Sequence, residues 1–137
     1  MASDHSGEQD EEGDPFAYLY HYEFVQLITF RKSGAGLPTA MWFAHDQGKL
    51  YMVTSSTAGK IKRIRNNERV LLAPCDLMGN ILGKQIEATA HELPAVLHAY
   101  ADVLLAVKYG VQYEMAASDE TDEAEEETFM ELVPVRE

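Results

Sequence analysis

Residues 23–54, EFVQLITFRKSGAGLPTAMWFAHDQGKLYMVT, contain three runs rich in β-branched and aromatic residues, which are typical of strands. The first run starts at Glu23, the second extends over 38–44, and the third over 49–54. The segment 32–36, with two glycines, separates the first pair, and Asp46-Gln47-Gly48 separates the second. This stretch therefore predicts three strands in meander order.

The residues on either side extend this pattern. A short helix is expected at 16–20, and the spacing of Ile61 and Ile64 predicts an amphipathic helix over 60–67. Residues 69–76 read as a fourth strand, Met78-Gly79-Asn80 as a turn, and residues 81–91 as a longer fifth strand. Five strands in this region predict a mainly β fold, closed or sandwiched, with flanking helices.

The C-terminal part of the sequence returns to a helical period over 95–109, and Gly110 is a plausible end for that helix. The acidic, low-complexity run 117–128 is expected to be a solvated loop, and 128–135 a final strand. The apolar stripe of the predicted helix comprises Val96, Tyr100, Val103, Leu104 and Val107, with His98, Ala99, Asp102 and Lys108 outside it.

The formal charge of −12 is unevenly distributed along the 137 residues. Residues 1–14 carry −6 and residues 114–137 carry −9, whereas residues 15–113 carry +3. We therefore expect a disordered acidic tail at 1–14 and a single domain over 15–137. The only cysteine, Cys75, can form no intramolecular disulfide, and the acidic N-terminus does not resemble a secretory signal, so we expect a cytoplasmic protein. No run approaches the roughly 20 apolar residues of a membrane helix.

Five of the eleven basic side chains fall within ten residues, 60–69. The preceding segment 54–59 supplies hydroxyl groups and a glycine at the start of the predicted helix, an arrangement that suits a phosphate. A merely solvated helix face is the alternative. Nucleic-acid binding is disfavoured, because the segment has no interleaved aromatic residues and the acidic tails would repel a polyanion.

Other motifs give little support for an activity. The glycine pair at 34–36 leads into a strand, whereas a dinucleotide-binding loop must open a helix. His21-Tyr22-Glu23 followed by Pro74-Cys75 is similar to a zinc deaminase signature, but Met78 stands where the second cysteine would be. The five histidines show no ligand spacing, so no metal is expected. Trp42, beside Phe43, suits either the core or the flat ring of a ligand.

The ordered series LITFRKSG (27–34), PTAMWFA (38–44), GKIKRIRNN (59–67) and VLLAPCD (70–76), continued by EATA (87–90) and KYG (108–110), resembles the pyridoxamine 5′-phosphate oxidase-like flavin and deazaflavin oxidoreductases. Within that family it is most similar to the branch of probable coenzyme F-420-dependent enzymes. The resemblance covers about residues 16–113. Ala40-Met41-Trp42 and Asn67-Glu68-Arg69 depart from the family's more usual Pro-Val-Trp and Asn-Pro-Arg.

This resemblance implies a split β-barrel, FMN-binding-like, that forms a homodimer with cofactor sites at the subunit interface. It also implies that the segment after the third strand holds the cofactor phosphate and that the second strand flanks the ring. The cofactor-binding residues expected on this basis are Lys60, Arg63, Ser55, Thr57, Trp42, Phe43 and Thr39.

The expected function is that of an oxidoreductase that transfers hydride between coenzyme F-420 or FMN and a small organic substrate. No catalytic residue is assigned, and Tyr51, Tyr109 and His45 are the candidates for a proton donor. The alternative is a non-catalytic module that binds a flavin, haem or another phosphate ligand on the same fold. Neither reading requires a separate metal-ion site in the protein, a nucleic acid or a membrane.

Overall fold

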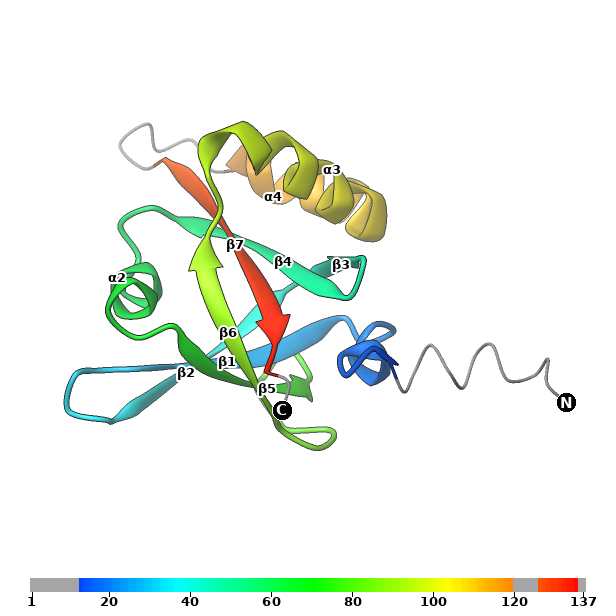
Figure 1. The fold of residues 1–137 in the computed structure, drawn as a ribbon. Coiled ribbons are helices and arrows are strands. Elements are labelled where there is room, and N and C mark those ends of the chain that lie inside the picture. The colour runs from blue at the N-terminus through cyan, green and yellow to red at the C-terminus, as the bar shows by residue number, and fades with distance from the viewer. Residues whose placement is uncertain (1–12, 120–125, 136–137) are drawn as a thin grey trace, which may run out of the picture.

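The computed structural model describes residues 13–119 and 126–135 (Figure 1). Most of the predicted acidic tail and the middle of the predicted acidic loop therefore lie outside the described residues. The elements in chain order are η1 (Ala17–Leu19), β1 (Phe24–Phe30), β2 (Gly36–Trp42), β3 (Ala44–Asp46), β4 (Lys49–Ser55), α2 (Gly59–Asn66), β5 (Arg69–Cys75), β6 (Ile86–Glu92), η2 (Ala95–Leu97), α3 (His98–Tyr109), α4 (Val111–Asp119) and β7 (Glu127–Pro134).

Seven strands of the described chain form one antiparallel sheet in the order β2-β1-β5-β6-β7-β4-β3. The two edge strands, β2 and β3, are consecutive in the chain and are separated only by Phe43. The sheet therefore curls until its first and last strands are joined covalently, without hydrogen-bonding to each other as strands. This is a split β-barrel, as predicted, with α3 and α4 stacked on one side and α2 at one end (Figure 1).

The split occurs at Phe43, where the sequence predicts a continuous strand over 38–44. The hydroxyl of Tyr109, from α3, accepts a hydrogen bond from the Phe43 backbone N–H at 2.9 Å. The same hydroxyl lies 2.9 Å from the Phe43 carbonyl oxygen and 2.7 Å from that of Glu23, to one of which it donates its proton. Because one distant side chain satisfies the Phe43 backbone, this residue can leave the ladder without an unpaired buried group.

The interior of the barrel is apolar and is closed at one end by α2. Ile61 and Ile64 of this helix are buried in the same cluster as Leu27, Met52 and Leu72 from the strands. The remaining face of α2 carries its basic residues to the surface. The predicted helix over 60–67 is thus confirmed, and its apolar pair anchors it to the barrel.

A second buried cluster lies between α3, α4 and the outer face of the barrel. Ala101, Leu105 and Tyr109, spaced four residues apart, form the buried side of α3 and pack near Phe129 of β7. The stripe selected from the sequence lies largely on the opposite side. Four of its five members are exposed, namely Val96, Tyr100, Val103 and Val107, and only Leu104 packs against the cluster.

The other differences from the expected elements are local. Residues 81–91 form an isolated bridge between Ile81 and Cys75, followed by β6 from Ile86, rather than one long strand. Residues 111–119 form a helix, α4, which the sequence analysis did not predict. Among the described residues no helix is both long and apolar enough to cross a membrane.

Candidate functional site

Two cations of the basic helix α2 bond to threonine hydroxyls at the end of the barrel. Arg63 donates from Nε to Oγ1 of the buried Thr29 at 2.7 Å. Lys60 donates from Nζ to Oγ1 of Thr54 at a longer distance of 3.4 Å. Because the two hydroxyls come from β1 and β4, these bonds fix both cations at the rim where the barrel meets the helix.

Two other arginines of the basic segment are paired with carboxylates. Arg65 bonds to Glu92 Oε1, with nitrogen–oxygen distances of 2.9 and 3.0 Å, and Arg69 lies 3.0 Å from Glu87 Oε2. Thr128 donates to the other oxygen of Glu92 at 2.7 Å, and this hydrogen bond, followed by those from Arg65, holds the pKa of Glu92 below its ordinary value. The positive charge of these two arginines is therefore already balanced.

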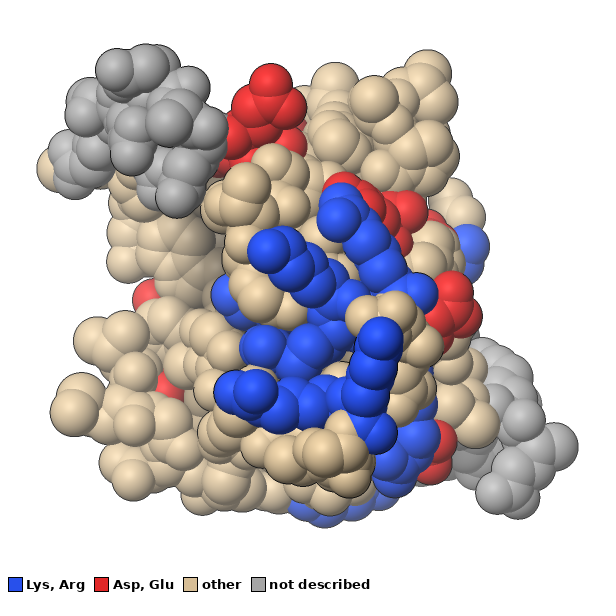
Figure 2. Space-filling model, turned by 90° about the vertical axis from the view of Figure 1, so that its left-hand side faces the viewer, with Lys and Arg blue, Asp and Glu red and all other residues tan. Residues whose placement is uncertain are grey.

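Lys60 and Arg63 are different, because no carboxylate in the described part of the chain lies within ion-pair distance of either. Burial, and then the charge of Arg63, lower the pKa of Lys60. Two adjacent cations that have no counter-ion among the described residues favour a bound anion, which would relieve their mutual repulsion. Figure 2 shows the Lys and Arg side chains gathered on this face of the molecule.

The start of α2 contributes further donors to the same place. Ser55 and Thr57 face each other with their hydroxyl oxygens 3.0 Å apart, and the Thr57 N–H bonds to Ser55 Oγ at 3.2 Å. Ala58 caps the helix without a side-chain hydrogen bond, so its first N–H groups are not used by a side-chain cap. A Cβ on Gly59 would lie 2.8 Å from Arg63 Nη1, which places the guanidinium directly over the start of the helix. Hydroxyls, helix N–H groups and two cations are what a phosphate group requires.

A cavity of about 750 Å³ opens on the outer side of the barrel near the split. Its walls come from segments far apart in the chain: the segment before β1, strands β1, β2 and β4, the end of β5, and the start of α4. Most of the lining is apolar or aromatic, including Phe24, Ala40, Met41, Trp42, Val53 and Leu82. Flat rings bind well to surfaces of this kind.

Trp42 is the central aromatic residue of this wall. Its ring stacks on that of Tyr109, with centroids 4.6 Å apart, and Tyr113 packs obliquely at 6.1 Å. Phe43 is fully buried in the barrel core instead, with the Lys108 Nζ 3.5 Å from its ring centroid. Thr39 lies on β2 opposite Leu27, on the face of the strand that points into the barrel.

The seven residues expected to hold a cofactor therefore fall into three groups. Lys60, Arg63, Ser55 and Thr57 lie together at the end of the barrel, and Trp42 lies in the wall of the cavity. Phe43 and Thr39 face the interior. The two regions meet at β4 on opposite faces of the strand: Val53 lines the cavity on the outer face, and the next residue, Thr54, accepts from Lys60 on the inner face.

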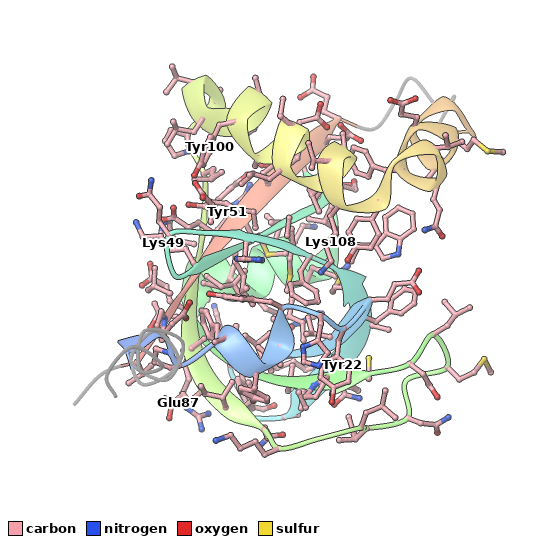
Figure 3. All side chains as sticks on the ribbon, turned by 90° about the vertical axis from the view of Figure 1, so that its right-hand side faces the viewer. Tyr22, Lys49, Tyr51, Glu87, Tyr100 and Lys108 are labelled. Atoms are coloured by element: carbon pink, nitrogen blue, oxygen red, sulfur yellow. The ribbon has the colours of Figure 1, made fainter. Side chains whose placement is uncertain are left out.

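None of the three candidate proton donors lines the cavity. The Tyr109 hydroxyl is committed to the backbone at the split, and Tyr51 donates to Glu131 Oε2 at 2.8 Å. Figure 3 shows Tyr51 close to Tyr100 beneath α3, where their rings meet edge to face with centroids 5.5 Å apart. His45 stacks on Tyr20 at 3.5 Å and lines a smaller cavity with Lys108. Their hydroxyl and ring nitrogen groups thus lie outside the large cavity.

The large cavity instead presents polar residues that the sequence analysis did not select, namely Tyr22, Glu23, Asp76 and Gln112. They come from three separate segments: Tyr22 and Glu23 precede β1, Asp76 follows β5, and Gln112 belongs to the unpredicted helix α4. No spacing pattern in the sequence could have grouped them. The described residues contain no cluster of three His, Cys, Asp or Glu side chains that could hold a metal ion.

Comparison with known proteins gives structural neighbours only: no family model matches the chain, and no curated protein matches its sequence. HutZ, the heme storage protein from Vibrio cholerae, superimposes with a TM-score of 0.64 at 15% identity, covering 85% of this chain and 84% of that one. A putative pyridoxamine 5′-phosphate oxidase from Listeria innocua gives 0.60 at 16% identity, covering 89% and 91%. An F420 reductase gives 0.59 at 20% identity, covering 88% and 93%.

These neighbours share most of their length with this chain, and they include proteins described as oxidoreductases and as a heme storage protein. At identities of 20% or less, the similarity concerns the fold. It agrees with the split-barrel topology of the sheet and with the resemblance carried by the ordered sequence motifs. The chain is therefore a split-barrel protein with the pyridoxamine 5′-phosphate oxidase-like fold.

Proposed function

We propose that this protein is an oxidoreductase that binds coenzyme F-420 or FMN and transfers hydride to or from a small organic substrate. The observation that carries the proposal is the adjacency of two complementary surfaces. Lys60 and Arg63 form a cation pair without a carboxylate partner among the described residues, and a broad aromatic cavity begins one residue away on β4. A flavin or deazaflavin has a phosphate-bearing tail and a flat ring, and it would use both.

The residues of this chain fit such a group. Lys60 and Arg63 would neutralise the phosphate, and the hydroxyls of Ser55 and Thr57 with the first N–H groups of α2 would complete its hydrogen bonds. The strand carrying Ala40 and Trp42 would flank the ring. When bound, the cofactor supplies the hydride chemistry, while the protein orients it and excludes water.

We further propose that the protein works as a cytoplasmic homodimer. Large apolar side chains are exposed at both edges of the cavity: Leu77, Met78 and Leu82 on the β5–β6 connection, and Val111 and Met115 on α4. Gln112, next to Val111, and Leu77 and Leu82 themselves line the cavity. A second copy of the chain on this rim would bury these side chains and enclose the site.

A second candidate function is binding without catalysis, with haem as the ligand. It is favoured by the likeness to a heme storage protein. The described histidines offer limited support, since His91 bonds to Glu131, His98 to the Leu93 carbonyl, and His45 stacks on Tyr20. His21, which stacks on Tyr22 at the edge of the large cavity, is the histidine best placed to reach a ligand there.

The experiment has a binding stage and a turnover stage. The purified protein is titrated with coenzyme F-420, FMN and hemin, and binding is followed by absorbance and by the emission of Trp42, the only tryptophan of the chain. Reduced cofactor and a panel of acceptors are then added. We expect a complex with F-420 or FMN and oxidation of the reduced form. A complex with hemin alone would overturn the proposal, and a tight flavin complex without turnover across the panel would favour the binding module.

A further inference from the structure

The large cavity has a charge of its own that is opposite to that of the basic end of the barrel. Its only charged lining residues are Glu23 and Asp76, and no Lys, Arg or His is among the described residues that line it. The other walls are apolar or aromatic, with Tyr22 and Gln112 as the uncharged polar groups. The charged residues among the described lining of this cavity are therefore both acidic.

Asp76 is held as a carboxylate. It accepts hydrogen bonds from the backbone N–H groups of Met78 at 3.0 Å and Asn80 at 2.9 Å, and from Asn80 Nδ2 at 3.0 Å. The bonds from Asn80 are the main reason that the pKa of Asp76 lies below its ordinary value. The turn after β5 thus fixes a negative charge in place at one edge of the cavity.

Glu23 provides the second negative charge, just before β1. Its backbone carbonyl lies 2.7 Å from the Tyr109 hydroxyl, which fixes the main chain at this position. Lys108 interacts electrostatically with Glu23, donates to the Tyr22 carbonyl oxygen at 3.1 Å and contacts the Phe43 ring. Lys108 does not line the large cavity, and no ion pair joins it to Glu23 within the described structure.

We propose that this cavity admits planar, apolar substrates that are uncharged or cationic, and that Glu23 and Asp76 are specificity-determining residues that disfavour phosphorylated or carboxylated compounds. This inference rests on the proposed function, because it assigns the substrate class of the same site. The cofactor's anionic group is accommodated by Lys60 and Arg63 at the end of the barrel. The cavity then needs no cation for the cofactor, and its acidic residues disfavour a substrate whose own anionic group would lie inside the cavity.

The test uses three naphthalene probes of nearly equal size: 2-naphthylmethylammonium, 2-naphthalenemethanol and 2-naphthoate. Each is titrated into the full-length protein, with and without bound F-420 or FMN, and binding is measured by calorimetry and by Trp42 emission. We expect the cation to bind about tenfold more tightly than the anion in dilute buffer, with the alcohol in between, and the ratio to shrink in concentrated salt because exposed charges are screened.

Matched variants assign the effect to these two residues. Glu23→Gln combined with Asp76→Asn should bring the affinities for cation and anion to within about twofold, leaving the alcohol unchanged, since each change removes one charge and keeps the side chain's size. Glu87→Gln removes a charge outside the cavity, where Glu87 pairs with Arg69, and should leave the ratio as it is. Urea unfolding of every variant checks that the turn held by Asp76 is intact.

Equal affinity of the wild-type protein for cation and anion, or a ratio that survives the double substitution, would overturn the inference. Because the probes are titrated without cofactor as well, this outcome is separate from failure of the proposed function, which would show as no binding of F-420 or FMN. A charge preference in a protein that binds neither cofactor would support the cavity's selectivity and remove the oxidoreductase assignment.

Discussion

The basic end of the barrel and the aromatic cavity adjoin along β4 but are built in opposite ways. At the barrel end, polar groups carried by three strands and by α2 are close together, and two cations remain without a carboxylate partner among the described residues. In the cavity, the walls are aromatic and aliphatic, and the charged residues among its described lining, Glu23 and Asp76, are both acidic. Val53 and Thr54 are consecutive in β4, so their side chains point to opposite faces of the strand, one toward the cavity and the other toward the barrel end.

This difference indicates a ligand with two unlike ends. A free phosphate would satisfy the barrel end alone, and an apolar molecule would satisfy the cavity alone. A molecule that bears a phosphate on one side and a flat ring on the other would use both, and a change in one region should then leave the other's contribution unchanged. Variants in each region separate the contribution of the barrel end to ligand binding from that of the cavity.

The largest effect is expected from Lys60→Ala and Arg63→Ala. Each should weaken binding of the phosphate-bearing cofactor by about 1.5–3 kcal/mol, the range for hydrogen bonds to charged groups, as measured by calorimetric titration. The affinity of the cavity for 2-naphthalenemethanol should not change. Lys62→Ala serves as the control, because it removes the same charge from an exposed position of the same helix.

Unchanged cofactor affinity in both variants would contradict the phosphate assignment. A loss of equal size in Lys62→Ala would mean that only the overall charge of the helix matters. Because Arg63 also bonds to the buried Thr29, its variant needs an unfolding measurement, and Arg63→Lys, which keeps the charge, provides a second comparison.

Next in size is the effect of Tyr109→Phe on folding. The substitution keeps the ring stacked on Trp42 but removes the hydroxyl that satisfies the Phe43 N–H at the split. Leaving buried backbone groups unpaired should lower the free energy of unfolding by about 1–3 kcal/mol, as measured in urea. Tyr18→Phe is the control, since that hydroxyl bonds to the Lys84 carbonyl at an exposed position and its loss should cost little.

If the two phenylalanine variants were equally stable, the hydroxyl of Tyr109 would not be what holds the split. Phosphate binding at the barrel end should be the same in both, since the tyrosine lies on the cavity side. A parallel loss of phosphate affinity in Tyr109→Phe would mean that the two regions are coupled through β4.

A smaller effect concerns the pH dependence of stability at the basic end. The hydrogen bonds from Thr128 and Arg65 hold the pKa of Glu92 below its ordinary value of 4.5. The folded state thus binds a proton less readily than the unfolded chain. The Glu92 carboxylate therefore stabilises the folded state fully above its pKa in the unfolded chain. This stabilisation is lost as the pH falls from that value through the pKa of Glu92 in the folded state. Glu92→Gln should make the free energy of unfolding depend less on pH than in the parent protein, over roughly pH 5 to 3.

A control for this prediction is Glu87→Gln, which also removes a carboxylate that faces an arginine but does so in a more exposed ion pair, and such pairs contribute little to stability. Its pH profile should follow that of the parent protein. The contrary result, an unaltered slope in Glu92→Gln, would mean that Arg65 and Thr128 gain as much from a neutral amide as from the carboxylate.

The sequence allowed much of the barrel to be predicted, because its strands and α2 are specified locally. The runs around Leu27 and Met52 have the residue types of strands, and Gly48 marks the turn between β3 and β4. Ile61 and Ile64 have the spacing of one face of a helix. The grouping of Lys60 and Arg63 with Ser55 and Thr57 could also be predicted, since these residues are neighbours in the chain.

The cavity could not be predicted, because its lining is assembled by tertiary contacts. Glu23, Asp76 and Gln112 come together only when the sheet curls and α4 covers the split. The break at Phe43 has the same origin: nothing near this residue ends the strand, and the hydroxyl that releases its backbone comes from Tyr109, 66 residues later. The local sequence pattern favours a continuous strand there, but the hydrogen bond to Tyr109 takes the Phe43 backbone out of the sheet.

The smallest expected effect concerns α3, where the periodicity offered two apolar faces and the face selected from the sequence is largely exposed. Val107 is 79% exposed, whereas Leu105 and Ala101 are fully buried in the cluster between α3 and the barrel. Val107→Thr, nearly isosteric, should therefore change the free energy of unfolding by less than about 0.5 kcal/mol. A loss well above that, growing with protein concentration in the urea titration, would show that this face is covered in the assembled protein and that its valines are buried after all.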